Sequence, residues 1–120
     1  MTKEQERSLK MARVICKALD EKKGLEIITL DISEISPLAD YFIIASATND
    51  SQLTAMEDEV FEKTREAGFH GKTAEGKVSG GWIVLDYGDV VVHLFKEEQR
   101  SFYDIERIWQ DAKALNLLED

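Results

Sequence analysis

Residues 81–95 constrain the fold of this chain more than any other segment. They contain two short apolar runs on either side of Tyr87-Gly88. Two such runs separated by two turn residues predict an antiparallel β-hairpin, although Tyr is an unusual first turn residue. A two-residue turn also fixes the register of the strands, and here it would place Trp82 opposite His93.

Side chains alternate along a strand, so the predicted hairpin has two faces of different composition. One face is wholly aliphatic and is expected to be core: Ile83, Leu85, Val90, Val92 and Leu94. The other combines aromatic side chains with two carboxylates near the turn: Trp82, Val84, Asp86, Asp89, Val91, His93 and Phe95. Aromatic side chains with a few charges are typical of protein–protein interfaces. Alternatively, a helix such as the last one covers this face.

Helix and strand periodicities alternate along the rest of the chain. Apolar residues spaced by three and four predict helices over residues 3–22, 49–68 and 97–114. Alternating or continuous apolar runs predict strands over residues 26–32 and 40–47, with a short edge strand at 72–75. The apolar side of the last predicted helix consists of Phe102, Ile105, Trp109 and Ala112.

The order of these elements predicts the fold class. The strand at residues 40–47 followed by a helix suggests a right-handed crossover to a parallel neighbouring strand. We therefore expect an α+β fold with a mixed β-sheet and helices packed on it. Residues 1–120 are the size of a single domain, with the core at about residues 9–112.

Composition excludes several classes of protein. Cys16 is the only cysteine and lies on the apolar stripe of the first predicted helix, so we expect it in the core. No Cys/His cluster suggests zinc, and no metal or cofactor site is predicted. The longest apolar runs are strand-sized, well below the ~20 residues of a membrane span. Residues 1–7 mix both charge signs and resemble no secretion or transit signal, which predicts a cytoplasmic protein.

The net charge is the first indication of function. The chain has 15 Lys and Arg against 24 Asp and Glu, a formal charge of −9. Such a chain is unsuited to holding nucleic acid, because phosphate neutralisation needs clustered basic residues. It would instead be attracted to a basic protein. The alternative is that the acidic surface serves only solubility.

Catalysis is the rival interpretation. Asp31, Asp86 and Asp89 on strands raise the possibility of metal-dependent nucleotidyl transfer, which needs converging carboxylates and a turn that holds phosphate. Residues 79–81 are glycine-rich, but no predicted helix follows them to supply a phosphate site. His93 has no evident nucleophile beside it and is better interpreted as a structural or interface residue. We expect no enzyme activity.

Several stretches resemble the Iojap, or ribosomal silencing factor, family. They follow the family order over about residues 9–112: Asp31-Ile32-Ser33, Ala39-Asp40-Tyr41-Phe42-Ile43-Ile44, Asn49-Asp50-Ser51-Gln52, Glu75-Gly76, Gly81 to His93, Arg100, Tyr103-Asp104-Ile105-Glu106 and Ile108-Trp109-Gln110-Asp111-Ala112. The hairpin stretch is the most specific of these. The resemblance implies a fold similar to that of nucleotidyltransferases, without their catalytic signature and without a cofactor.

The resemblance also implies a partner and a mechanism. The family binds universal large-subunit ribosomal protein fourteen, where it sterically blocks the small subunit and represses translation; a role in large-subunit assembly is also associated with it. From expected exposure and the motif match, the predicted contact residues are Trp82, Asp86, Tyr87, Asp89 and His93, flanked by Lys72, Glu75 and Asp40. An exposed aromatic face would also allow a homodimer. The alternatives are a nucleotidyltransferase-like enzyme and a generic acidic adaptor.

Overall fold

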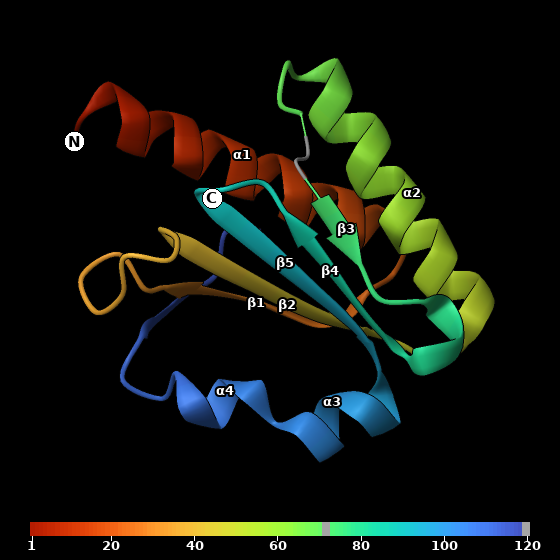
Figure 1. The fold of residues 1–120 in the computed structure, drawn as a ribbon. Coiled ribbons are helices and arrows are strands. Elements are labelled where there is room, and N and C mark those ends of the chain that lie inside the picture. Colours follow the sequence, from red (N-terminus) through yellow and green to blue (C-terminus); the bar gives the residue numbers. More distant parts are fainter. Residues whose placement is uncertain (71–72, 119–120) are drawn as a thin grey trace.

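A central β-sheet organises the chain in the computed structural model, which describes residues 1–70 and 73–118. Within these residues the sheet has six strands in the order β3-β4-β5-β2-β1-β6 (Figure 1). The strands are β1 (Leu25–Asp31), β2 (Tyr41–Ala47), β3 (Thr73–Glu75), β4 (Trp82–Asp86), β5 (Val90–Lys96) and β6 (Lys113–Leu115). The helices are α1 (Lys3–Glu21), α2 (Asp50–Glu66), α3 (Glu97–Tyr103) and α4 (Ile105–Ile108), with a 3₁₀ turn at Val78–Gly80.

Helices cover both faces of the sheet: α1 and α2 lie on one side, α3 and α4 on the other (Figure 1). Both long helices begin at side-chain caps. The Thr2 hydroxyl accepts from the backbone N–H of Gln5 at 3.1 Å, and the Gln5 side chain accepts in return from the Thr2 N–H. Asn49 caps α2 by accepting from the N–H of Gln52 at 2.8 Å. The first two predicted helices are thus confirmed.

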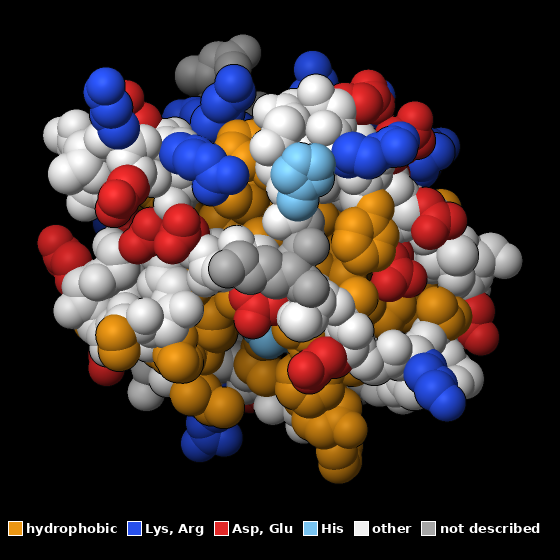
Figure 2. Space-filling model, turned by 45° about the horizontal axis from the view of Figure 1, so that its top comes forward, with side chains coloured by type: hydrophobic (Ala, Val, Ile, Leu, Met, Phe, Trp, Pro, Cys, Tyr) orange, Lys and Arg blue, Asp and Glu red, His pale blue; other side chains and the backbone are white. Residues whose placement is uncertain are grey.

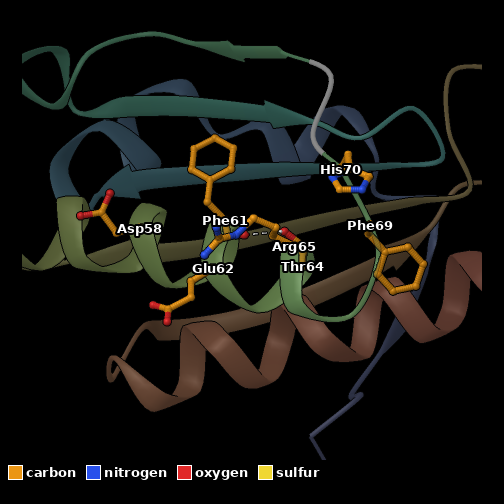
Figure 3. Close-up of a pocket in the computed structure, with 7 residues that line it drawn as sticks. All are labelled: Asp58, Phe61, Glu62, Thr64, Arg65, Phe69 and His70. Atoms are coloured by element: carbon orange, nitrogen blue, oxygen red, sulfur yellow. Dashed lines mark hydrogen bonds between the residues drawn. The ribbon is translucent and has the colours of Figure 1, made fainter.

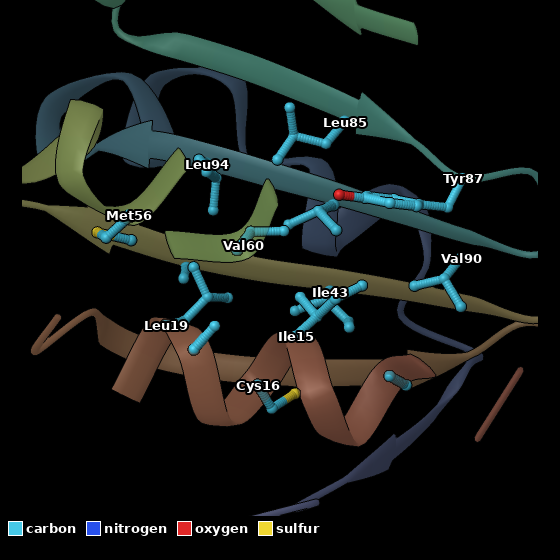
Figure 4. Close-up of a cluster of buried hydrophobic side chains, with 14 of the residues drawn as sticks. Ile15, Cys16, Leu19, Ile43, Met56, Val60, Leu85, Tyr87, Val90 and Leu94 are labelled. Atoms are coloured by element: carbon cyan, nitrogen blue, oxygen red, sulfur yellow. The ribbon is translucent and has the colours of Figure 1, made fainter. Parts of the chain in front are cut away.

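The main core lies between the sheet and the two long helices (Figure 4). Its buried side chains include Ile15, Leu19, Ile43, Met56, Val60, Leu85, Val90 and Leu94. The aliphatic face of the hairpin is entirely within it, as predicted from the alternation. Cys16 is also buried, with its Sγ 3.2 Å from the Thr29 hydroxyl, and burial raises the pKa of its thiol. The predicted core role of Cys16 is confirmed.

The centre of the sheet is a parallel strand pair. β2 runs parallel to β5, with Tyr41 opposite Val90 and Ala47 opposite Lys96. The predicted crossover to a parallel neighbour is therefore present, and α2 forms part of the connection. All other pairings in the sheet are antiparallel within the described residues, so the sheet is mixed as expected.

The hairpin has a different register from the predicted one. Trp82 pairs with Phe95 rather than with His93, because the turn lies one residue further along the chain. The N–H of Tyr87 donates to the carbonyl of Val90 at 2.9 Å, which leaves the following two residues as the turn. The shift on the partner strand is two residues. Both faces therefore keep their predicted composition.

Packing of Tyr87 explains the position of the turn. Its ring lies in the core, and its hydroxyl is 3.0 Å from the hydroxyl of Thr64 on α2. Gly88 then takes the left-handed conformation, with φ 88°, and its N–H donates to the Asp86 carboxylate at 2.8 Å. A tyrosine at a turn position would instead lose this burial.

The C-terminal segment is not the single helix that its periodicity predicts. Helix α3 ends at Asp104, which has a left-handed conformation with φ 45° and ψ 49°. Helix α4 follows in a new direction, and the chain then adds β6 as an edge strand beside β1. We call this break the α3–α4 kink.

Arg100 provides the physical reason for the kink. Its guanidinium donates to the Ser46 hydroxyl at 2.7 Å, to the Leu25 carbonyl at 3.2 Å and to the Glu106 carboxylate at 2.8 Å. The bond between residues six positions apart spans the kink, since a straight helix would point these two side chains in different directions. Burying the guanidinium requires these partners.

The kink also corrects the prediction for Phe102. Periodicity placed it on the buried side of one helix with Ile105, Trp109 and Ala112. Ile105 is indeed buried, and Trp109 and Ala112 pack beside it. Phe102 is 80% exposed, because the kink changes the orientation of α3 relative to α4.

Substitutions at Asp104 test the kink directly. Asp104→Ala is expected to be less stable than Asp104→Gly by about 1 kcal/mol, because a left-handed conformation costs an L-residue ~1–2 kcal/mol that glycine avoids. In a continuous helix the order would reverse, since alanine is favoured over glycine by about 1 kcal/mol. Urea unfolding of the two variants is the measurement. An alanine variant as stable as the glycine variant, or more stable, would contradict the kink.

Candidate interaction surface

Four carboxylates gather at one end of the sheet, where β1 and β4 end and β2 and β5 begin. We call this group the acidic end: Asp31, Asp40, Asp86 and Asp89. The N–H of Asp40 donates to the Asp89 carbonyl at 2.8 Å, so these two backbones are adjacent. The Ser8 hydroxyl on α1 donates to the Asp40 carboxylate at 2.8 Å. The structure thus brings together three of the predicted contact residues.

The four carboxylates differ in their hydrogen bonds to the rest of the chain. Asp86 accepts from the N–H of Gly88, and Asp31 accepts from both the N–H and the hydroxyl of Ser33 at 3.0 and 2.6 Å. These bonds hold local turns. The Asp89 carboxylate is exposed and makes no hydrogen bond or ion pair with residues 1–70 or 73–118. Asp89 is therefore the acid best placed to meet a partner.

The face of the hairpin that points away from the main core contributes to a cluster of six ring side chains. We call it the aromatic cluster: Phe42, Trp82, His93, Phe95, Tyr103 and Trp109. The Trp82 ring stacks on Phe95 at 5.0 Å and meets Tyr103 at 4.5 Å between centroids. Trp109 packs edge-on against Phe42, also at 5.0 Å. Of the two interpretations of this face, an exposed interface or a face covered by the C-terminal segment, the second holds over much of it, because α3 and α4 supply apolar side chains that cover it.

Trp82 and His93 form a polar pair inside this cluster. The indole Nε1–H donates to His93 Nδ1 at 3.3 Å, so the remaining imidazole proton belongs on Nε2. His93 is only 8% exposed, and its Nε2 has no hydrogen-bond partner among the described residues. Burial lowers the pKa of His93 from 6.5 to about 4. The imidazole is therefore neutral at pH 7, whereas Trp82 remains half-buried and reaches the surface.

The other predicted contact residues lie apart from this cluster. Tyr87 belongs to the main core between the sheet and helices α1 and α2, where burial raises the pKa of its phenol. The expectation that it is exposed is therefore wrong. Glu75 is exposed on the edge strand β3. Lys72 lies outside the described residues.

Three exposed apolar side chains on α3 and α4 were missed by the sequence prediction. Phe102 is 80% exposed, Ile108 73% and Tyr103 45%. Helical periodicity assigned Phe102 to a buried stripe, so it gave no signal of exposure. Tyr103 and Ile108 lie within the stretches that resemble the family, which was the available signal for those two residues.

The surface in Figure 2 shows an uneven distribution of side-chain types. Hydrophobic side chains gather in the lower half of this view, with acidic side chains among them. Lysine and arginine side chains lie mainly along the upper half. Apolar and acidic groups therefore share a region of this face, an arrangement that suits a partner with a basic rim.

A hollow of about 400 Å³ lies beside α2 (Figure 3). Its lining combines both charge signs with two aromatic rings: Asp58, Phe61, Glu62, Thr64, Arg65, Phe69 and His70. The guanidinium of Arg7 lies over the Phe69 ring at 4.9 Å. His70 is exposed. The hollow shows no constellation of nucleophile and base, and we assign it no chemistry.

A second hollow lies at the carboxyl ends of the parallel strands β2 and β5. In open α/β sheets this is where nucleotides and other ligands usually bind. Its lining residues are Thr48, Asn49, Asp50, Ser51, Lys96, Glu97, Glu98 and Gln99. Lys96 Nζ is paired with Asp50 at 2.9 Å. The carboxylates of Glu97 and Glu98 therefore have no cation among the residues of this lining. A phosphate group would be repelled, so the geometry gives the nucleotidyltransferase interpretation no support.

The described residues offer neither a metal site nor a membrane span. No group of three or more His, Cys, Asp or Glu side chains that could hold a metal ion occurs in residues 1–70 and 73–118. No helix in those ranges is both long and apolar enough to cross a bilayer.

The fold and this surface define the class of protein: a small α+β domain with an acidic sheet end and exposed apolar side chains on α3 and α4. The chain belongs to the family described as ribosomal silencing factor during starvation, whose model matches residues 5–120. It is 38% identical to ribosomal silencing factor RsfS of Bacillus subtilis over 113 residues, 94% of this chain and 93% of that protein. It is 33% identical to chloroplastic protein Iojap of Zea mays over 112 residues, 91% of this chain and 47% of that protein.

Solved structures agree with this assignment. A crystal structure of a Chromobacterium violaceum protein matches with a TM-score of 0.81 and 37% identity, covering 84% of each chain. One from Bacillus halodurans matches with a TM-score of 0.78 and 29% identity, covering 89% of this chain and 97% of that one. The α+β fold and the family resemblance are confirmed, while the likeness to nucleotidyltransferases stays a prediction. Membership supports a ribosome-associated role in silencing translation, and the family is not known for enzyme activity.

Burial of His93 predicts how stability depends on pH. Because its pKa is about 4 when folded and near 6.5 when unfolded, the unfolded chain binds more protons between these values. Stability should therefore fall as the pH drops from about 6.5 to 4. With roughly 1.4 kcal/mol per pKa unit, acidification from pH 7 to pH 4.5 should cost the wild type about 2 kcal/mol more than His93→Gln. Urea unfolding at both pH values measures this, and carboxylates common to both proteins cancel. Equal losses would show that His93 is protonated without penalty.

Trp82→Ala should cost stability as well as any binding it supports. The sequence analysis treats Trp82 as an exposed contact residue, and truncating such a residue would leave the aliphatic core face intact. Its contacts with Phe95, His93 and Tyr103 now predict a loss of about 2–3 kcal/mol in unfolding free energy, somewhat below that of a fully buried tryptophan. Trp82→Phe keeps an aromatic ring in place and should lose less. Urea denaturation of both variants is the test, and an unaffected alanine variant would restore the exposed interpretation.

Proposed function

We propose that this protein binds the large ribosomal subunit in the cytoplasm through universal large-subunit ribosomal protein fourteen. Bound there, it sterically prevents the small subunit from joining and so represses translation. The same contact would serve large-subunit assembly. The observation that carries the proposal is the acidic end of the sheet, with exposed Asp89, in a chain of the silencing-factor family.

Electrostatics supports a basic protein as the partner. The chain carries a formal charge of −9, and four of its carboxylates lie together at the acidic end. Ribosomal proteins are commonly basic, so complementary charge would speed the encounter and fix its orientation. The effect acts over a Debye length of about 8–10 Å and weakens with added salt.

The proposed contact surface keeps the predicted residues, with different weights. Asp89 and Glu75 are exposed and would meet the partner directly, with Asp40, Asp86 and Lys72 as flanking residues. Trp82 would contribute its accessible edge. His93 and Tyr87 would act by holding the hairpin in shape, since both are buried.

Steric silencing requires a body of sufficient size and rigidity. The chain measures 38 × 32 × 28 Å along its principal axes. A folded body of these dimensions on the joining surface of one subunit would keep the other from approaching. Neither a catalytic residue nor a cofactor is needed for this mechanism.

A charge reversal tests the proposal with a matched control. Asp89→Lys should weaken binding to purified large subunits at least about tenfold at low salt, because it places a cation where a basic partner docks. Asp20→Lys makes the same change in charge near the C-terminal end of α1 and should bind as the wild type does. Co-sedimentation, followed by addition of small subunits, measures both binding and blocked joining.

Three outcomes would count against the proposal. If the wild type fails to co-sediment at low and moderate salt, the ribosomal role is wrong. Equal losses for both reversals would mean that only overall charge matters. Binding to many unrelated basic proteins with similar affinity would favour a generic adaptor.

A further inference from the structure

Phe102 and Ile108 on α3 and α4 point into solvent, and Tyr103 beside Phe102 is partly exposed although its ring contacts Trp82. Phe102, Tyr103 and Ile108 are 80%, 45% and 73% exposed, and we call them the apolar ridge. Single exposed apolar residues are ordinary on soluble proteins. Three within residues 102–108 on one kinked segment suggest a binding surface, because water-exposed apolar groups of this size do not stabilise the fold.

The ridge is held in place rather than frayed. Arg100 fixes α3 to the backbone of β1 and to Ser46 of β2, and it fixes α4 through Glu106. The Tyr103 ring lies on Trp82 at 4.5 Å, and the edge of the Phe102 ring meets Tyr103 at 5.1 Å. A surface fixed before binding loses little conformational entropy when a partner docks.

The conformation of Asp104 sets the exposure of Phe102. Asp104 is left-handed, a conformation that aspartate adopts more readily than most L-residues, and the kink it permits turns Phe102 outward. A continuous helix would place Phe102 on the apolar side. The Arg100 bonds that stabilise the kink therefore also hold Phe102 at the surface.

We infer that the apolar ridge is part of the docking surface, with Phe102 as the side chain that enters an apolar pocket of a basic protein partner. This inference rests on the proposed function and extends its surface from the hairpin to α3 and α4. Tyr103 contacts Trp82, so the ridge adjoins the end of the hairpin where β4 begins, the end away from Asp86 and Asp89.

The charges around the ridge select the occupant. Exposed acidic side chains on and beside α3 and α4 are Glu97, Glu98, Asp104 and Asp111, which outnumber the exposed bases Arg107 and Lys113. A second copy of this chain would bring the same carboxylates against them and be repelled. A partner with an apolar pocket inside a positively charged rim would match both the ridge and its surroundings.

Phe61 provides a matched control. It is also an exposed phenylalanine, at 37%, but it lies on α2 on the opposite side of the sheet, beside the hollow in Figure 3. Truncating either ring removes the same chemical group. Only Phe102 belongs to the proposed surface.

The experiment compares Phe102→Ala, Ile108→Ala and Phe61→Ala with the wild type in binding to purified large subunits. Phe102→Ala should weaken binding at least about tenfold, as expected for an aromatic residue that dominates an interface. Ile108→Ala should weaken it less, and Phe61→Ala should leave it within about threefold of the wild type, the ordinary range for a truncation outside the interface. Urea midpoints of the Phe102 and Ile108 variants should equal that of the wild type, because the removed atoms are exposed.

Each contrary result has a distinct meaning. Wild-type affinity for Phe102→Ala would show that the apolar ridge is not part of the docking surface and would leave the proposed function standing. Absence of wild-type binding would overturn both. A larger loss for Phe61→Ala would place the partner on the α1–α2 side. A concentration-dependent dimer in sedimentation equilibrium that Phe102→Ala abolishes, with unchanged affinity for large subunits, would assign the ridge to a second copy.

Discussion

Burial of β2 on both faces is the constraint on which the rest of the structure depends. All seven residues of this strand are buried, so a layer of side chains must cover each side of the sheet. Helices α1 and α2 supply one layer. The other has to come from the segment after β5, where only short elements remain within the described residues. The aromatic cluster and the kinked C-terminal segment both result from this need to cover the second face.

Arg100 connects that covering layer to the sheet. A buried guanidinium is costly unless its donors are satisfied, and Leu25, Ser46 and Glu106 satisfy them from three separate elements. The position of α3 and α4 is thereby set by polar geometry as well as by apolar contact. The same geometry determines which apolar side chains the layer buries and which, such as Phe102, it exposes.

The resulting surface combines two properties useful to a factor that acts by occupying a subunit face. In the proposed complex, carboxylates at the acidic end would provide long-range attraction to a basic partner, whereas apolar side chains would provide short-range affinity once water is displaced. The half-buried Trp82 connects the hairpin to α3 through Tyr103, at the end of the hairpin away from the acidic end.

The sequence by itself determined the elements before residue 97 and the main core, but not the division of the C-terminal segment into α3, α4 and β6. Alternation in residues 81–95 determined both hairpin faces, and they survived the error in register because the shift was an even number of residues. Motif order determined the family, and the net charge is the basis for proposing a basic partner. Only the tertiary structure decided that Tyr87 is buried, that α3 and α4 cover the aromatic face and that Phe102 is exposed. The reason is that local periodicity reports which side chains are apolar, whereas contacts distant in sequence, such as Arg100 with Ser46 and Tyr87 with Thr64, decide where each one lies.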